Sequence, residues 1–304
     1  MTTEFIKYPH LERLGHPLVE DILNGDIYVF PKLDGTNASM WYDPVAGKCC
    51  YGSRNRQLSI EQDNQGFMAA MEGPEGEQYR LFCAKFPHLR LYGEWLVPHS
   101  IKHYRTEAYR QFYIFDVWDS LLNRFVHYEQ YYWILSNFEV NVVAPLAFGN
   151  IASFGEEVKK TFSKLAKNTY LIDTPGLHGE GIVIKRYDYS NRFGNTVWAK
   201  IINDSFVNVA GNKVPTGSLT VEEDIANALV TQALVDKEYA KIINDQAVYN
   251  SVIPRLLGTV YHCVISEELY GYLKRIKGPV NFKQLQKEVY SKVKELKKEL
   301  FNGS

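Results

Sequence analysis

A lysine at the end of an expected strand is the residue of this sequence best placed to do chemistry. Lys32 follows the β-branched and aromatic run 27–30 and precedes the turn-forming pair Asp34-Gly35, so its amine should stand at the lip of a sheet, where a ligand can sit. Only a neutral amine can attack phosphorus, and an ordinary lysine is almost wholly protonated at pH 7. Burial and nearby cations favour the neutral form. The sequence offers three cationic side chains for this, besides a bound metal ion: Arg54, Lys185 and Lys200.

Taken alone, the pattern Lys32-Leu33-Asp34-Gly35 is weak, because a surface lysine beside a turn would look the same. An ordered series of short segments downstream changes this interpretation. The segments lie on or beside expected strands. In chain order they are Ser53-Arg54-Asn55, Leu91-Tyr92-Gly93-Glu94-Trp95, Ile114-Phe115-Asp116-Val117, Glu180-Gly181-Ile182-Val183-Ile184-Lys185 and Trp198-Ala199-Lys200-Ile201.

This series resembles the nucleotidyltransferase motifs of the ligases and capping enzymes that carry a nucleotide on a lysine. The resemblance covers residues 32–200, over half of the chain. Within that superfamily the sequence is most similar to the RNA ligase 2 type, for two reasons. Thr36-Asn37 directly follows the glycine, and the region after residue 210 has a helical pattern, whereas DNA ligases and capping enzymes continue into an OB-fold barrel.

The resemblance implies a role for each matched residue of the first segments. Lys32 would attack the α-phosphate of ATP, release pyrophosphate and carry AMP. Gly35 would let the backbone turn close to the nucleotide. Asn37 would hold a metal-bound water during sealing, or it is simply a turn-capping side chain. Arg54 would grip phosphate oxygens or contact the sugar, or it is a solvated surface arginine.

The later segments would complete the nucleotide site. By the same resemblance, Glu94 would accept hydrogen bonds from the ribose hydroxyls, and Phe115 would stack on adenine unless it is a core aromatic. Glu180 would hold a divalent ion near the α-phosphate, and Lys185 would neutralise phosphate charge. Strict strand alternation puts positions 180 and 185 on opposite faces. Both can reach the nucleotide only if one lies beyond the strand end or a bulge intervenes.

The last segment departs from the family pattern. That pattern is usually Lys-x-Lys, which puts two ammonium groups on one strand face. Here the match is either Trp198-Ala199-Lys200 or Lys200-Ile201-Ile202, so an apolar residue replaces one lysine. Lys200 is expected to keep the contact with the α-phosphate.

The elements that must position these residues fall into two regions. Residues 1–212 have short strand-like runs separated by Gly, Asn and Asp, with helical patches near 61–72 and 153–168. They are expected to form an α+β, ATP-grasp-like adenylyltransferase (nucleotidyltransferase) domain of antiparallel sheets with helices. Residues 217–304 are expected to form a small, mostly α-helical C-terminal domain.

The helical expectation for the second region rests on capping and periodicity. Thr220, with Glu223 three residues later, forms a candidate capping box. Near the end of the chain, apolar residues recur at steps of three and four, which predicts one apolar helical stripe. Its members are Phe282, Leu285, Val289, Val293, Leu296 and Leu300. Lysines occupy the other faces and could contact a phosphate backbone, or they are merely solvated.

Composition sets outer limits on the function. The chain has 304 residues, a net charge of -1 and 45% hydrophobic residues, as expected of a globular protein with a sizeable core. Near-neutrality neither favours nor excludes nucleic acid, because a local basic groove is enough. The four cysteines lack a zinc spacing, and the sequence has no apolar signal region or membrane-length stretch. A cytoplasmic monomer is expected.

The function expected from the resemblance is an ATP-dependent RNA ligase. Three transfers would join the ends: Lys32 takes AMP from ATP, the RNA 5′-phosphate takes AMP from Lys32, and the 3′-hydroxyl attacks the adenylated end. The cofactors would be ATP and Mg²⁺ (or Mn²⁺), and the partners nicked or broken RNA ends. Two alternatives stay open: a DNA ligase or capping-type nucleotidyltransferase on the same core, and a non-catalytic nucleotide or RNA end-binding protein.

Overall fold

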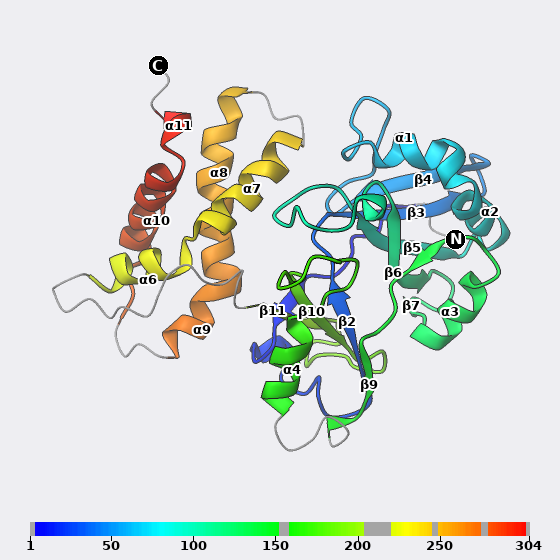
Figure 1. The fold of residues 1–304 in the computed structure, drawn as a ribbon, viewed down its shortest axis with the longest axis horizontal. Helices are drawn as coiled ribbons and strands as arrows, with labels where there is room; N and C mark the ends of the chain where they lie inside the picture. The colour runs from blue at the N-terminus through cyan, green and yellow to red at the C-terminus, as the bar shows by residue number, and fades with distance from the viewer. Residues whose placement is uncertain (1–3, 152–157, 204–219, 245–248, 275–278, 302–304) are drawn as a thin grey trace. The chain divides into compact units, whose positions relative to one another are not determined.

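A computed structural model describes residues 4–151, 158–203, 220–244, 249–274 and 279–301. The chain divides into two compact units, Met1–Asn203 and Asp204–Ser304 (Figure 1). The expected domain boundary, after residue 212 and before residue 217, lies outside the described residues. All of the predicted site residues belong to the first unit.

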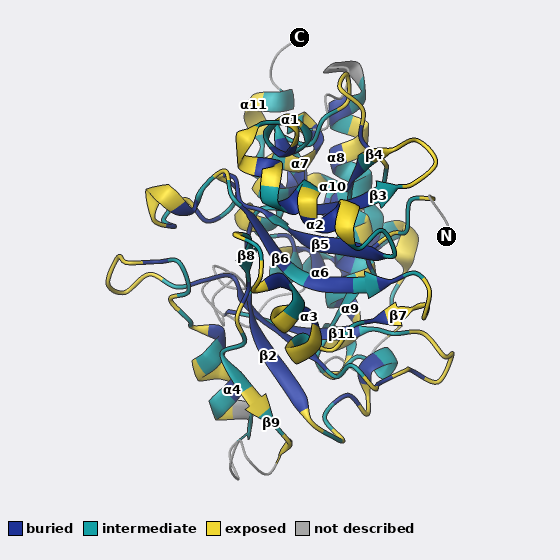
Figure 2. Cartoon of the chain, turned by 90° about the vertical axis from the view of Figure 1, so that its right-hand side faces the viewer, coloured by how far each residue is buried: buried dark blue, intermediate teal, exposed yellow. Residues whose placement is uncertain are grey.

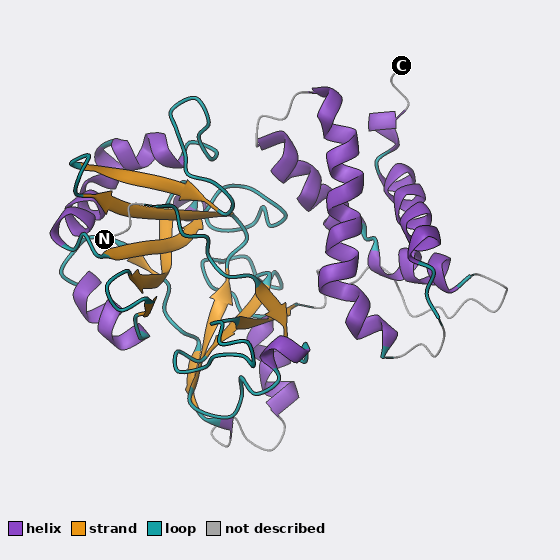
Figure 3. Cartoon of the chain, turned by 180° about the vertical axis from the view of Figure 1, so that it is seen from behind, coloured by secondary structure: helices purple, strands orange, loops and turns teal. Residues whose placement is uncertain are grey.

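The first unit contains two sheets, drawn as arrows in Figure 3. Sheet A has the strand order β1-β11-β10-β2-β9, and its pairs are antiparallel except for β1 with β11. Its strands are β1 (Leu11–Arg13), β2 (Ile27–Lys32), β9 (Ala147–Gly149), β10 (Gly181–Lys185) and β11 (Trp198–Ile202).

Sheet B has the order β4-β3-β5-β6-β7, and the short strand β8 pairs with β6. The β6–β8 pair is parallel and the other pairs are antiparallel. The strands are β3 (Thr36–Asp43), β4 (Lys48–Ser53), β5 (Leu89–Trp95), β6 (Phe112–Asp119), β7 (Arg124–Phe125) and β8 (Asn141–Val142).

Helices cover the outer faces of both sheets. The α-helices of the first unit are α1 (Phe67–Glu72), α2 (Glu77–Lys85), α3 (Tyr128–Leu135) and α4 (Val158–Ala166). Single 3₁₀ turns are η1 (Pro17–Val19), η2 (Pro74–Gly76) and η3 (Thr106–Ala108). Side chains of α1, α2 and α3 share a core with sheet B, and α4 packs on sheet A.

The inner faces of the two sheets pack against each other. Val183 and Trp198 of sheet A share one buried cluster with Tyr92 and Phe125 of sheet B. The neighbouring strand residues Ile182 and Ile184 lie instead in the α4 cluster, as strand alternation requires. The strands of the inner layers are mostly buried, as the dark colour of β2, β5 and β6 in Figure 2 shows. Sheet A therefore has an α4 face and a sheet-B face, and the second of these carries the site.

The described part of the second unit is helical. Thr220 forms the predicted capping box with Glu223 at the start of the first helix, α6. Of the predicted apolar stripe, Leu285, Val289 and Val293 are buried in the core of this unit, whereas Phe282 is 50% exposed. Phe282 is the first residue of its helix, ahead of the turns that pack. The elements are α6 (Val221–Leu229), α7 (Gln232–Asn244), α8 (Tyr249–Cys263), the π-helical turn η5 (Val264–Glu268), α9 (Leu269–Leu273), α10 (Phe282–Leu296) and α11 (Lys298–Phe301).

Length and polarity rule out a membrane-crossing role for any helix in the part of the chain that the structure describes.

Candidate active site

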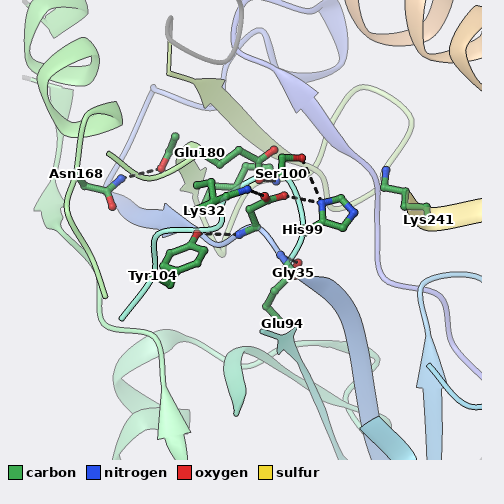
Figure 4. Close-up of polar contacts among 12 residues, drawn as sticks. Lys32, Gly35, Glu94, His99, Ser100, Tyr104, Asn168, Glu180 and Lys241 are labelled. Carbon is green, nitrogen blue, oxygen red and sulfur yellow. Dashed lines mark hydrogen bonds and ion pairs between the residues drawn. The ribbon is translucent and has the colours of Figure 1, made fainter. Parts of the chain in front are cut away.

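Lys32 ends β2 and contacts a carboxylate 148 residues further along the chain. Strand β10 pairs with β2 so that Gly181 lies opposite Lys32. Glu180, the residue just before β10, accepts a hydrogen bond from Lys32 Nζ at 2.5 Å. The two side chains are 17% and 5% exposed, so the ion pair is largely shielded from water. Figure 4 shows both side chains. The sheet register therefore brings together the predicted nucleophile and the predicted metal ligand.

Gly181 explains how Glu180 reaches the lysine. Its φ of +153° is a conformation that L side chains rarely adopt, and a Cβ there would lie 2.1 Å from the carbonyl oxygen of Ile201. Only glycine fits, and its backbone releases the preceding residue from strand alternation. Glu180 lies beyond the strand end, which is one of the two geometries that the sequence allowed.

Three predicted lysines lie on the same face of sheet A. Lys200 pairs with Val183, which pairs with Phe30, and Val183 belongs to the cluster between the sheets. By alternation from these positions, Lys32, Lys185 and Lys200 all lie on the sheet-B face. These three side chains therefore start from one face of the sheet and are not distributed over both faces.

Sheet B contributes Asn37 and Glu94, which are directly paired across β3 and β5. Glu94 Oε1 accepts a hydrogen bond from the backbone N–H of Gly35 at 2.9 Å. Gly35 leaves no room for a side chain, because a Cβ there would be 2.5 Å from the carbonyl oxygen of Trp95. Asn37 Oδ1 is buried, and no described residue bonds to it. An oxygen without a protein partner is free to receive a ligand's donor or a water.

Burial raises the pKa of the Glu94 carboxyl to about 7. Lys32 and the Gly35 N–H oppose this rise, whereas the negative charges of Glu180 and Asp34 add to it. Three carboxyl groups thus share the surroundings of one lysine. Such a site has an excess of negative charge that a cation would relieve.

Asp34 has a structural role that the sequence interpretation missed. It is 2% exposed, and its carboxylate accepts the N–H of Ile101 at 2.5 Å and lies 3.0 Å from His99 Nδ1. Its own N–H donates to the Tyr104 hydroxyl at 3.0 Å. These bonds tie the turn after Lys32 to the loop that follows β5 (Figure 4). The sequence showed an aspartate two residues after the lysine, and this aspartate was interpreted only as a turn former.

Lys185 and Phe115 form a second cluster around Asp116. Lys185 is 1% exposed, and its Nζ donates to Asp116 Oδ2 and to the Phe115 carbonyl, each at 2.7 Å. Burial lowers the pKa of Lys185, and Asp116 opposes that shift. Tyr8 and Tyr187 also donate to Asp116. The Asp116 carboxylate therefore supplies the counter-charge of the buried Lys185 ammonium group.

The Phe115 ring is half-buried at the edge of this cluster. Its centroid lies 5.0 Å from that of Tyr8 in an edge-on arrangement, and Lys185 Nζ lies 5.2 Å from it. Arg54, just after β4, contacts His10 Nδ1 through Nη2 at 3.0 Å. Hydrogen bonds thus pair Lys32 with Glu180 and Gly35 with Glu94, and the charges of Lys32 and Glu180 act on the Glu94 carboxyl. Phe115 and Lys185 form a neighbouring set, and Arg54 contacts the N-terminal segment.

The fold and the site define a two-sheet α+β domain with a lysine and carboxylates between its sheets. The family model for RNA ligase matches residues 25–202, which is more than half of the chain. The chain therefore belongs to the RNA ligase family. This confirms the predicted resemblance and the α+β fold with a helical C-terminal region.

Solved structures with the same fold come from an RNA ligase of Naegleria gruberi. The structure with PPi is 19% identical to this chain and has a TM-score of 0.50. The match covers 68% of this chain and 58% of the Naegleria chain. An alanine variant with ATP and Mn is 20% identical, with a TM-score of 0.51 and the same coverage. The chain thus spans less than two thirds of these relatives. A comparison with curated protein sequences found no significant match.

Proposed function

We propose that this chain is an ATP-dependent RNA ligase that joins a 5′-phosphate to a 3′-hydroxyl through AMP bound covalently to Lys32. The observation that carries the proposal is the position of Lys32. It stands at a strand end beside Glu180, on the sheet face that also carries Lys185 and Lys200. Family membership and the ATP-bound structures of the Naegleria relative support ATP as the nucleotide.

Lys32 Nζ would form a bond to the α-phosphorus of ATP while the bond to pyrophosphate breaks. Glu180 occupies Lys32 Nζ with a hydrogen bond at 2.5 Å, so the amine must leave this bond before it attacks. A divalent cation held by Glu180 would take the carboxylate away from the lysine.

The residues fit a divalent cation of the Mg²⁺ or Mn²⁺ type. Glu180 is a hard oxygen ligand in a carboxylate-rich site. Burial is the main cause of the raised pKa of Glu94, and the negative charges of Glu180 and Asp34 add to it. No cluster of three metal-binding side chains occurs among the described residues, so phosphate and water would complete the shell. When bound there, the cation would neutralise charge on the α-phosphate.

The second and third transfers would reuse the same positions. A 5′-phosphate oxygen of RNA attacks the α-phosphorus, and the bond to Lys32 Nζ breaks. The 3′-hydroxyl oxygen then attacks the RNA 5′-phosphorus, and AMP leaves. Lys185, Lys200 and Arg54 are proposed to hold phosphate charge, Glu94 the ribose hydroxyls and Phe115 the adenine, with Asn37 serving the sealing step. The partners proposed are nicked or broken RNA ends.

The four free cysteines are compatible with the reducing cytoplasm that we propose as the location. Monomeric behaviour stays a prediction.

Labelling of the protein with α-³²P-ATP tests the covalent step. The protein is first treated with pyrophosphate, which strips any AMP already attached. ATP with Mg²⁺ or Mn²⁺ should then label Lys32, GTP should not, and Lys32→Ala should abolish the label. Lys283→Ala, at a lysine in the first turn of α10, is the matched control and should label normally.

A nicked duplex RNA with a 5′-phosphate tests the sealing steps. Wild-type protein should give sealed product, and single-stranded RNA compared in parallel would define the duplex preference. Labelling by GTP alone would overturn the choice of nucleotide. Binding of RNA ends with neither label nor sealed product would favour a non-catalytic end-binding protein.

A further inference from the structure

Two asparagines hold the short segment that presents Glu180. The N–H of Gly179 donates to the Asn168 carbonyl at 2.8 Å, and Asn168 Nδ2 donates to the Gly181 carbonyl at 2.9 Å. From the other side, the N–H of Asn203 donates to the Glu180 carbonyl at 2.8 Å. Asn203 Nδ2 also reaches the Gly179 carbonyl at 3.3 Å. Asn168 and Asn203 therefore form hydrogen bonds to the backbone of each residue from 179 to 181.

This segment needs external support because glycine flanks Glu180 on both sides. Gly179 and Gly181 have the widest conformational freedom of any residue type, so local sequence does not fix the direction of the Glu180 side chain. Gly181 has left the ordinary strand conformation as well, with its φ of +153°. The asparagine bonds supply the restraint that the local chain lacks.

Asn168 links this restraint to the packed part of the domain. It follows α4, whose Phe162 and Ala166 are buried against Ile182 and Ile184 of sheet A. Its Nδ2 also donates to the Leu165 carbonyl at 3.2 Å, at the end of that helix. The side chain thus bridges a rigid helix end and the residue next to Glu180, and Figure 4 shows it directed at this backbone.

The opposite end of the amide is also occupied. Asn168 Oδ1 accepts the N–H of Tyr170 at 3.2 Å, which fixes which end of the side chain points at Gly181. Aspartate in its place would keep this acceptor but lose the donor to Gly181 and Leu165. The two functions of the side chain can therefore be separated by one conservative change.

We propose that Asn168 is a positioning residue, which holds the Glu180 carboxylate in the orientation that binds the divalent cation during nucleotide transfer. The inference rests on the proposed function, because it assumes that Glu180 is the metal ligand. Residues behind a metal ligand typically set its affinity for the metal. Asn168 touches neither nucleotide nor metal in this scheme and acts only through the backbone on either side of Glu180.

The test measures how much Mn²⁺ improves binding of an ATP analogue, without any turnover. The analogue carries a methylene group between the α- and β-phosphorus atoms, so it cannot transfer AMP to Lys32. Calorimetry of pyrophosphate-treated protein gives its affinity with and without Mn²⁺. The ratio of the two affinities is the metal coupling of the site.

Asn168→Ala should leave the affinity for the analogue without Mn²⁺ within about twofold of wild type. It should reduce the gain in affinity from Mn²⁺ about tenfold, which is the lower end of the effects of mutating residues behind a metal ligand. Asn168→Asp should behave like the alanine variant, because it lacks the same donor. Asn137→Ala is the matched control. Asn137 Nδ2 donates to the Trp133 and Ile134 carbonyls at the end of α3, so its loss removes a similar helix-end contact, and the gain should stay as in wild type.

A double variant separates positioning from general damage. Glu180→Gln should itself lose most of the gain from Mn²⁺, and adding Asn168→Ala to it should change nothing further. An unchanged gain in Asn168→Ala, beside a lost gain in Glu180→Gln, overturns the role of Asn168 alone. A full gain in Glu180→Gln overturns the assignment of Glu180 and with it the proposed metal chemistry. A metal-free affinity that falls as far as the metal-bound one would show a merely structural role for Asn168.

Discussion

Replacing Glu94 by glutamine should change how the stability of the first unit depends on pH. Burial raises the pKa of this carboxyl from an ordinary 4.5 to about 7. Below pH 4.5 the group is protonated in the folded and the unfolded chain, and its titration costs nothing. Between pH 4.5 and 7 the unfolded chain releases the proton while the folded chain keeps it, so stability falls as pH rises.

The size of the effect follows from the shift. Above pH 7 the full cost is present, and a rise from 4.5 to about 7 corresponds to about 3 kcal/mol. Glutamine keeps an oxygen that can accept the Gly35 N–H but cannot ionise. The free energy of unfolding of Glu94→Gln should therefore exceed that of wild type by about 1 kcal/mol at pH 5 and by up to about 3 kcal/mol at pH 8.5.

Tryptophan fluorescence during urea denaturation measures the free energy of unfolding of the first unit. All five tryptophans lie within residues 1–203, so the signal reports the first unit alone. The protein is stripped of AMP, and ATP and metal are left out, because either would stabilise the ionised carboxyl. Glu139→Gln, at an exposed glutamate of the same unit, is the matched control. A Glu94→Gln difference that stays within about 0.5 kcal/mol from pH 5 to 8.5 would refute the reasoning.

Three further substitutions test other parts of the fold. Gly181→Ala should destabilise the first unit by about 2 kcal/mol or more and abolish labelling by ATP, because φ and the nearby Ile201 carbonyl both exclude a side chain; normal labelling would contradict this. Asp116→Asn should cost about 3–5 kcal/mol in urea denaturation, since it leaves Lys185 buried without a counter-charge, and adding Lys185→Met should recover part of the loss. Thr220→Ala should remove the capping box of α6 and cost the second unit about 1 kcal/mol, measured by circular dichroism at 222 nm; an unchanged midpoint would show that the cap is dispensable.

Local pattern predicted those strands that have a short β-branched or aromatic core between turn residues. The runs 27–30 and 181–184 became β2 and β10 with nearly these bounds. What pattern could not supply is which strand pairs with which. Lys32 and Glu180 are 148 residues apart in sequence, and only the antiparallel register of β2 and β10 makes them neighbours.

The sequence indicated candidate site residues one at a time, but it could not show which distant residues contact them. Lys185 was predicted to neutralise phosphate charge, and this stays a prediction. Its ion pair with Asp116 was not predicted, because it depends on the packing of two sheets. Asp34 was interpreted as a turn former, because the residues that surround it come from the loop after β5. The sequence did not indicate a role for Asn168. Its side chain bonds to a backbone carbonyl, and every residue has one, so the identity of the partner residue carries no pattern.

The register of β11 bears on the incomplete last motif. Ile202 lies opposite Gly181, which lies opposite Lys32, so position 202 is level with the nucleophile. Trp198 is four residues away, about 13 Å along the strand, and it is fully buried in the cluster between the sheets. An ammonium group at position 198 would be buried among aromatic rings far from Lys32. Position 202 is on the same face as Lys200 and nearer the site, so the segment matches Lys-x-Lys as Lys200-Ile201-Ile202, with isoleucine in place of the second lysine.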